Sequence, residues 1–196
     1  MNHPLWRRVA DLIIACTLIL LTLPFLAVFA LTIKLDSSGP VFYRQERVGL
    51  GGRRFMLVKF RSMVRDAEPD GQPVWAVERD IRITRIGRFL RCTRLDELPQ
   101  LFNVLRGDMS MIGPRPERPY FVDQLNKIIP SFSERLKVNP GITGWAQVNY
   151  PYGASIYDAR QKLSYDLYYI RNRSVIFDLI ILLLTVDVVI WQKGAR

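Results

Sequence analysis

The feature that most constrains this chain is a long uncharged segment near its start. From Leu12 to Ile33, 22 consecutive residues lack a charged side chain. A helix of this length can span the hydrocarbon core of a bilayer. Arg7 and Arg8 precede the segment and Lys34 follows it, so basic residues flank both ends and favour neither orientation across a membrane.

Three interpretations of this segment compete. A signal peptide would end near Val28-Phe29-Ala30, but the uncharged run is longer than the apolar core of such peptides. A spanning helix would have to accommodate Pro24, which removes a backbone hydrogen bond. A re-entrant segment would use Pro24, near the middle of the run, to return to the side from which it entered. Composition alone leaves the spanning and re-entrant interpretations open.

A second apolar stretch runs from Val175 to Ile190 and contains Asp178 and Asp187. Only eight uncharged residues separate the two aspartates, which is too few to cross a membrane. We therefore predict either a buried helix or an amphipathic helix that lies in the membrane interface.

The charge balance and the scarcity of histidine and cysteine limit the possible chemistry. The chain has 28 Lys and Arg against 18 Asp and Glu, and its formal net charge of +10 suits anionic lipid, nucleic acid or phosphorylated substrates. His3 is the single histidine, which argues against a histidine-based triad and the usual structural zinc ligands. Cys16 and Cys92 lie 76 positions apart and suggest no disulfide framework, so we predict a reducing, cytoplasmic setting.

The segment between the two apolar stretches predicts a small, helix-rich α+β domain. Residues 41–48 and 54–60 flank a glycine-rich turn and predict a β-hairpin. Apolar residues at helical spacing predict helices over residues 95–105, 121–129 and 156–170. We divide the chain into an N-terminal membrane helix, residues 1–36, and a cytoplasmic or interfacial domain, residues 37–196.

Arginines recur at every third position from 79 to 94, at positions 79, 82, 85, 88, 91 and 94. A step of three residues drifts around an α-helix by about 60° per repeat, so six such side chains cannot share one face. We predict that several of them point toward a common centre from different parts of the backbone. The alternative is a solvated basic surface, which accounts for most charge runs.

Asp96 and Glu97 follow this arginine series directly. Pro99 fits a helix only in its first turn, so the acidic pair lies near a helix N-terminus. One interpretation is N-capping by Asp96 with a favourable first-turn Glu97. The other is a carboxylate inside a phosphate-binding environment, where Mg²⁺ held by Asp96 and substrate phosphates would offset the repulsion. The residues alone leave both interpretations open.

A stiff loop, Gly113-Pro114-Arg115-Pro116, follows the acidic pair. Two residues with fixed φ flank Arg115, whose guanidinium suits bidentate contact with phosphate. The flat faces of Pro114 and Pro116 could support a base or a sugar ring.

Together these segments resemble the bacterial sugar transferases, the monotopic polyprenyl-phosphate phosphoglycosyl transferases that start glycan assembly on a lipid carrier. The resemblance rests, in family order, on GPVFYRQERVGLGGRRFMLVKFRSM, DIRITRIGRFLRCTRLDELPQLFNVLRGDMSMIGPRPE, NPGITGWAQVNY and KLSYDLYYIRNRSVIFDLIILLLTV. These segments cover most of the chain from Gly39 to Val186 and are similar to the catalytic core of the family.

The resemblance implies a covalent, two-step transfer of a sugar 1-phosphate from a UDP-sugar to undecaprenyl phosphate, with release of UMP. Asp96 would be the nucleophile and would also contact Mg²⁺, while Glu97 would act as an acid/base or positioning group. The substrate-binding residues that we predict are Lys59, Arg61, Arg91, Pro114, Arg115 and Pro116.

The resemblance also implies that the N-terminal helix breaks at Pro24 and re-enters the cytoplasmic face of the bacterial inner membrane. Small members of the family carry Ser-Pro at this break, whereas this chain has Leu23-Pro24. The expected partners are a UDP-sugar, undecaprenyl phosphate and membrane lipid, and not nucleic acid. The family resemblance raises a homodimer as an option, but the sequence leaves the oligomeric state open.

A membrane-tethered nucleic-acid-binding or scaffold protein without catalysis is the rival hypothesis. Aromatic residues such as Phe42, Tyr43 and Phe55 could stack bases, but this hypothesis leaves the acidic pair without a role. The sequence does not select the sugar. Residues 66–80, predicted as a loop, and the stretch 150–155 are where we look for sugar discrimination.

Overall fold

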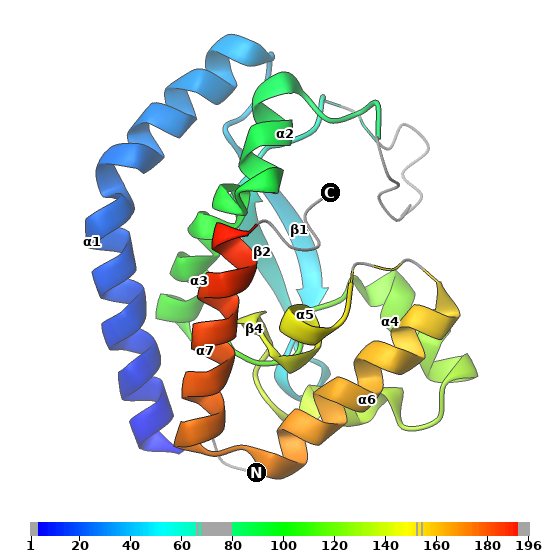
Figure 1. The fold of residues 1–196 in the computed structure, drawn as a ribbon. Coiled ribbons are helices and arrows are strands. Elements are labelled where there is room, and N and C mark those ends of the chain that lie inside the picture. The colour runs from blue at the N-terminus through cyan, green and yellow to red at the C-terminus, as the bar shows by residue number, and fades with distance from the viewer. Residues whose placement is uncertain (1–3, 66, 68–79, 152, 154, 192–196) are drawn as a thin grey trace.

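The computed structural model describes residues 4–65, 67, 80–151, 153 and 155–191. In Figure 1 a β-hairpin lies between α1 on one flank and α4 and α6 on the other. Along the chain, the helices and strands are α1 (Leu5–Asp36), β1 (Phe42–Val48), η1 (Leu50–Gly52), β2 (Arg54–Phe60), α2 (Arg85–Cys92), η2 (Leu95–Gln100), α3 (Leu101–Arg106), β3 (Ser110–Ile112), α4 (Pro119–Ile128), η3 (Phe132–Lys137), β4 (Gly141–Thr143), α5 (Trp145–Asn149), α6 (Ile156–Asn172) and α7 (Val175–Ile190), where η marks a 3-10 helix. The predicted helix-rich α+β fold is confirmed.

The predicted β-hairpin is present. β1 and β2 pair antiparallel, from Phe42 opposite Phe60 to Val48 opposite Arg54. The turn requires left-handed backbone, which Gly51 adopts with a φ of 62°. The glycine-rich sequence between the strands therefore sets their register.

A second, two-stranded sheet is not predicted by the sequence pattern. β3 and β4 pair in parallel, with Ser110 opposite Gly141 and Ile112 opposite Thr143. The two segments approach closely, because a Cβ added to Gly141 would lie 2.0 Å from the backbone nitrogen of Gly113. Strands of three residues are too short to show an alternation of apolar and polar residues, so the pattern misses them.

The three predicted helices are confirmed. The first begins as the 3-10 helix η2 and continues as α3, which ends where Gly107 adopts a φ of 88°. The second is α4, and the third is α6, whose first turn is capped by the Ser155 hydroxyl accepting the Asp158 N–H. Of the loop predicted over residues 66–80, only positions 67 and 80 belong to the described part of the chain.

α1 continues through Pro24 without interruption, which corrects the break expected at that residue. A proline removes a single backbone donor from a helix, and here the helix bends instead of ending. Figure 1 shows the axis of α1 curving toward α2 over its C-terminal part. The Thr22 hydroxyl donates to the Leu18 carbonyl at 2.7 Å, so it does not replace the bond that Pro24 denies to the carbonyl of Leu20.

Both ends of α1 are tied to the rest of the molecule by polar contacts. Near its start, the buried Asp11 carboxylate accepts hydrogen bonds from the Ser110 hydroxyl at 2.7 Å and the Met111 N–H at 2.9 Å. Just after its end, the buried Arg61 guanidinium donates to the Ser37 carbonyl at 2.7 Å. The helix is therefore part of the folded body and not a detached anchor.

Between these ties, α1 exposes an apolar surface, and by length and composition the helix could cross a membrane. α7 exposes similar side chains, while Asp178 within it forms an ion pair with Arg7 at 2.9 Å. We call the following residues, each more than half exposed, the apolar face: Leu20, Leu21, Leu23, Phe25, Val28 and Leu31 on α1, and Ile176, Leu179, Leu183, Val186 and Ile190 on α7.

Asn103 joins α3 to the hairpin. Its side chain is fully buried, its amide oxygen accepts the Val58 N–H at 3.1 Å, and its amide nitrogen donates to the Met56 carbonyl at 2.8 Å. Because α3 follows η2 directly, these two bonds hold β2 against the segment that carries the acidic pair.

We expect Asn103→Ala to lower the free energy of unfolding by about 3 kcal/mol, because two partly buried backbone groups of β2 lose their partners and the fully buried side chain leaves a cavity. Chemical denaturation in detergent measures the change. Asn126→Ala, on the exposed side of α4, is the control. Equal stability of the two variants would contradict this role for Asn103.

Candidate active site

The acidic pair lies at the start of η2. Arg94 stands at the N-cap of η2 with a φ of 57°, a left-handed conformation that is uncommon outside glycine. Asp96 and Glu97 occupy the first turn, as Pro99 predicts. No side chain caps η2, so N-capping by Asp96, one of the two interpretations of the sequence, is wrong.

Glu97 is clamped by Arg115. The two guanidinium Nη atoms of Arg115 donate to the two carboxylate oxygens of Glu97, at 3.1 Å and 2.5 Å. Burial by itself would raise the pKa of Glu97, but the charge and the hydrogen bonds of Arg115 outweigh it and lower that pKa. Glu97 is therefore ionised and oriented.

Asp96 has a different environment, although it is adjacent in sequence. It is 6% exposed, and no residue in the described part of the chain donates a hydrogen bond to its carboxylate. Burial and the neighbouring charge of Glu97 raise the pKa of Asp96, while Lys59 and Arg91 oppose the shift. A carboxylate with nearby cations and no donor is available to bind a metal ion or to attack a phosphorus atom.

Lys59 on β2 brings a third part of the chain to the same place. Its ammonium lies 5.4 Å from the centre of the Tyr43 ring, a cation–π contact. Burial lowers the pKa of Lys59 to about 8, and the charge of Asp96 opposes the shift. The hairpin therefore supplies a cation to the acidic pair.

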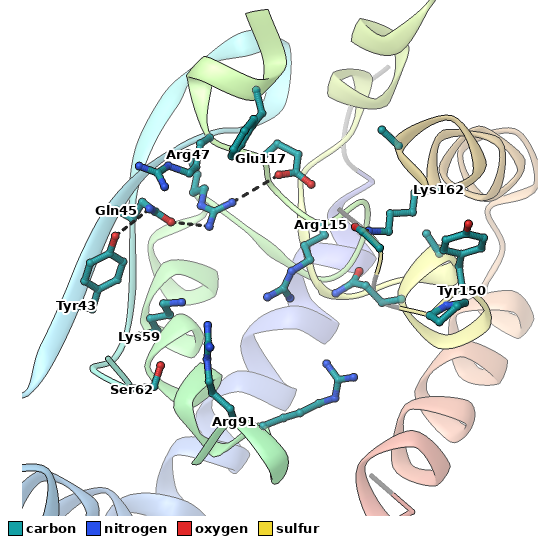
Figure 2. Close-up of a pocket in the computed structure, with 18 of the residues that line it drawn as sticks. Tyr43, Gln45, Arg47, Lys59, Ser62, Arg91, Arg115, Glu117, Tyr150 and Lys162 are labelled. Atoms are coloured by element: carbon teal, nitrogen blue, oxygen red, sulfur yellow. Dashed lines mark hydrogen bonds and ion pairs between the residues drawn. The ribbon is translucent and has the colours of Figure 1, made fainter. Parts of the chain in front are cut away.

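A cavity of about 710 Å³ opens on this side of the molecule. Figure 2 shows Lys59 and Arg91 at one end of it and Lys162 and Tyr150 at the other, with Arg115 between them. The basic residues that line it are Arg47, Lys59, Arg61, Arg65, Arg82, Arg91, Arg94, Arg115, Arg118, Arg135 and Lys162. Its acidic lining residues are Glu117 and Asp166. This excess of positive charge suits a polyanion such as a diphosphate.

The acidic pair does not line this cavity itself. Lys59, Arg91 and Arg115 connect the acidic pair with the cavity, because all three line the cavity and their charges also act on Asp96.

The arginine series contributes partly as predicted. Arg82, Arg91 and Arg94 line the cavity from three different parts of the backbone, which agrees with the prediction of a common centre. Arg85 and Arg88, on α2, are not among the lining residues, and position 79 lies outside the described residues.

Arg61 lines the cavity, but its nearest contacts are structural. Its Nη2 atom donates to the Ser37 carbonyl at 2.7 Å and to the Ser37 hydroxyl at 2.8 Å, at the end of α1. Its Nε and Nη1 atoms are buried without a hydrogen bond. The role predicted for Arg61 in substrate binding stays a prediction.

The two prolines of the Pro114–Pro116 loop are not among the residues that line the large cavity, although Arg115 between them is, and their predicted role in substrate binding stays a prediction. The Pro114 carbonyl accepts the Gly141 N–H at 3.0 Å, and the Pro116 carbonyl accepts an Nη atom of Arg47 at 2.9 Å. They hold the loop in place through their carbonyls.

Several lining residues are not singled out by the sequence reasoning. Arg47, Glu117, Lys162 and Asp166 lie inside the segments that carry the family resemblance, but nothing in their spacing marks them as site residues, and Arg135 lies outside those segments. All five reach the cavity through tertiary packing. The stretch 150–155, in which we look for sugar discrimination, does reach the cavity, because Tyr150, Pro151, Gly153 and Ser155 line it.

No group of three or more His, Cys, Asp or Glu side chains suited to a metal ion occurs among the residues that the structure describes. Within the acidic pair, both oxygens of Glu97 are bound by Arg115, so Asp96 is the member of the pair whose carboxylate could hold a hard cation. A site of this kind would need oxygen ligands from the substrate.

Comparison with known proteins extends these observations. The family model described as bacterial sugar transferase matches residues 2–192. The chain is 46% identical over 190 residues to the UDP-N-acetylgalactosamine-undecaprenyl-phosphate N-acetylgalactosaminephosphotransferase of Aeromonas hydrophila, covering 97% of this chain and 45% of that protein.

Several relatives carry the name UDP-glucose:undecaprenyl-phosphate glucose-1-phosphate transferase, among them proteins of Escherichia coli and Caulobacter vibrioides. The chain is 44% identical to the Escherichia coli protein, covering 93% of this chain and 39% of that one. It is also 44% identical to the Caulobacter vibrioides protein, covering 96% of this chain and 71% of that one. The chain thus spans less than half the length of the Aeromonas and Escherichia relatives.

The match extends over nearly all of the chain and includes the acidic pair, the arginine series and the Pro-Arg-Pro loop. Relatives named for two different sugars are almost equally similar, so overall identity does not indicate the sugar. On the strength of the family match and of these identities, the chain belongs to the bacterial sugar transferase family.

Proposed function

We propose that this chain transfers a sugar 1-phosphate from a UDP-sugar to undecaprenyl phosphate through a covalent aspartyl phosphosugar, and so starts the assembly of a surface glycan. The observation that carries the proposal is Asp96, a buried carboxylate without a hydrogen-bond donor, beside cations that line a strongly basic cavity. The names of the relatives, which specify UDP-sugars and undecaprenyl phosphate, support the same reaction.

In the first step, a carboxylate oxygen of Asp96 attacks the phosphorus that bears the sugar. An acyl phosphate bond forms, the bond from that phosphorus to the bridging oxygen of the diphosphate breaks, and UMP leaves with the electron pair. Lys59, Arg91 and Arg115 neutralise the charge on the phosphoryl oxygens.

In the second step, a phosphate oxygen of undecaprenyl phosphate attacks the same phosphorus. The acyl phosphate bond breaks, the carboxylate of Asp96 is regenerated, and the product is the sugar joined to the lipid by a diphosphate. The lowered pKa of Glu97 and its two hydrogen bonds with Arg115 favour a positioning role over acid/base chemistry.

Mg²⁺ fits this donor set with a single protein carboxylate. Asp96 would hold the ion together with phosphate oxygens of the substrate, because Mg²⁺ in phosphoryl-transfer sites commonly uses one or two carboxylates and retains other oxygen ligands. The bound ion supplies positive charge to the diphosphate. Arg115 keeps Glu97 out of that role by occupying both of its oxygens.

We also propose that α1 re-enters the cytoplasmic face of the inner membrane. Asp11 and Arg61 tie the two ends of α1 to one folded body, so the ends cannot lie on opposite sides of a bilayer while that body stays on one side. The apolar face would sit in lipid, and the net charge of +10 favours anionic headgroups.

This topology predicts that cysteines placed at either end of α1 react only with a reagent supplied on the cytoplasmic side. Single cysteines at Leu5 and Ser38, placed in a chain with Cys16 and Cys92 replaced by Ala, should both be protected from a membrane-impermeant maleimide in intact spheroplasts. Both should be labelled in inverted vesicles. Labelling of one site from each side would show a spanning helix instead.

Two measurements on the wild-type chain in lipid or detergent test the reaction. The first is UMP release from a panel of UDP-sugars that begins with glucose and N-acetylgalactosamine, in the presence of Mg²⁺ and undecaprenyl phosphate. The second is the intact mass of the protein with the UDP-sugar alone, where we expect one phosphosugar adduct that disappears when the lipid acceptor is added. Folded protein that releases no UMP from any donor would overturn the proposed function, and turnover without an adduct would overturn the covalent route.

A further inference from the structure

Arg135 contacts the backbone of the residue whose side chain clamps Glu97. Its Nη2 atom donates to the carbonyl of Arg115 at 2.8 Å. Arg115 lies between Pro114 and Pro116, which have no N–H to donate, so carbonyl groups are the main positions at which the loop can be held. Arg135 therefore holds Arg115 by its main chain, while Arg115 holds Glu97 by its side chain.

Arg135 is in turn held by Asp166. The Nη2 atom of Arg135 and the Oδ2 atom of Asp166 are 2.8 Å apart, and the two side chains are only 7% and 3% exposed. The guanidinium also lies over the ring of Phe132, at 5.1 Å from its centre, and Phe132 belongs to a hydrophobic core cluster. The pair thus joins η3 to α6 and is buried against the core.

Stability alone does not account for this buried pair. Removing two charges from water costs free energy that their attraction barely recovers, and well-packed apolar residues of similar size are often equally stable or more so. The Nε atom of Arg135 remains buried without a hydrogen bond, which adds to the cost. Burial raises the pKa of Asp166 to about 6, although Arg135 opposes that shift. Both residues line the cavity of the candidate active site.

We propose that Arg135 and Asp166 form a positioning pair for Arg115, setting the Pro114–Pro116 loop so that the Arg115 guanidinium faces Glu97 and the substrate phosphates. This inference rests on the proposed function, because its effect is read in UMP release. The contacts of the pair run to the main chain of Arg115 and to the Phe132 ring, and not to Asp96 or Glu97, so we assign both residues an indirect role through Arg115.

The test replaces the pair with apolar residues, as Arg135→Met/Asp166→Leu. We expect thermal stability equal to or above that of the wild type, and a kcat for UMP release about 10-fold to 100-fold lower, because misplacing a catalytic group by about 1 Å can cost that much. Arg54→Gln/Glu46→Gln, which removes an exposed ion pair on the hairpin, is the matched control and should leave kcat unchanged.

A double-mutant cycle separates positioning from a general structural effect. In an Arg115→Ala background the same replacement should lower kcat by less than about twofold, because the group that the pair positions is already absent. If Arg135→Met/Asp166→Leu does not fold, Arg135→Lys replaces it in the cycle. The lysine keeps the charge opposite Asp166 but lacks the planar guanidinium, so it should lower kcat in the wild-type background and have little effect in the Arg115→Ala background.

Provided that the wild-type chain releases UMP, two results would overturn the inference. One is an unchanged kcat in a folded pair variant, and the other is an equal loss with and without Arg115. A wild-type chain that releases no UMP from any UDP-sugar would instead overturn the proposed function, so the two failures are distinguishable.

Discussion

Asp96→Asn is expected to abolish UMP release, with kcat lowered by roughly 10⁴-fold or more, as for other nucleophiles whose removal blocks a covalent step. The amide cannot form the acyl phosphate and is a weak ligand for Mg²⁺. The variant should fold at least as well as the wild type. Burial and Glu97 already disfavour a charge at Asp96, so a neutral residue of the same shape relieves that repulsion.

UMP release under saturating UDP-sugar, together with the intact mass of the protein, measures this loss. Asp123→Asn removes an equal charge from the exposed side of α4 and is the control. A folded Asp96→Asn protein with wild-type turnover would refute the covalent aspartate, and a variant that still carries the phosphosugar adduct would move the nucleophile to another residue.

Arg115→Ala is expected to lower kcat by about 10²-fold to 10³-fold, the range for loss of a preorganised charge in an active site. The change removes a guanidinium from the cavity wall and both hydrogen bonds to Glu97. Burial would then dominate the environment of Glu97 and raise its pKa.

Kinetics in detergent measure this change, with Arg106→Ala at the exposed end of α3 as the control. Arg115→Lys should remain well below the wild type, because a single ammonium cannot bond both oxygens of Glu97 in parallel. Full activity of the lysine variant would show that the positive charge of Arg115 is sufficient and that its paired hydrogen bonds to Glu97 are not required.

The sequence identifies much of the fold because the relevant signals are local. The glycine-rich turn predicts the β1–β2 hairpin, and apolar stripes predict the helical segment 95–105, α4 and α6. The uncharged run predicts the long apolar helix α1, but not its path, since a proline in a helix permits either a bend or a break. The parallel pair of β3 and β4 leaves no signal, because it joins segments about 30 residues apart in strands too short to show a pattern.

The candidate site divides in the same way. Residue types and spacing single out Asp96, Glu97 and Arg115 as chemically capable, and the family resemblance supplies their expected roles. In the sequence Asp96 and Glu97 are adjacent carboxylates with nothing to distinguish their roles. Only the structure shows that Arg115 binds both oxygens of Glu97, whereas none of the described residues donates a hydrogen bond to Asp96.

By itself, then, the sequence determined which residue types are available for chemistry and which local elements carry them. Only the tertiary structure decided which side chains meet: Lys59 beside Asp96, Arg135 on the carbonyl of Arg115, and both ends of α1 on one body. The physical reason is that turns and periodicity report the backbone over a few residues. Contacts between distant segments depend instead on how the whole chain buries its apolar surface and pairs its charges.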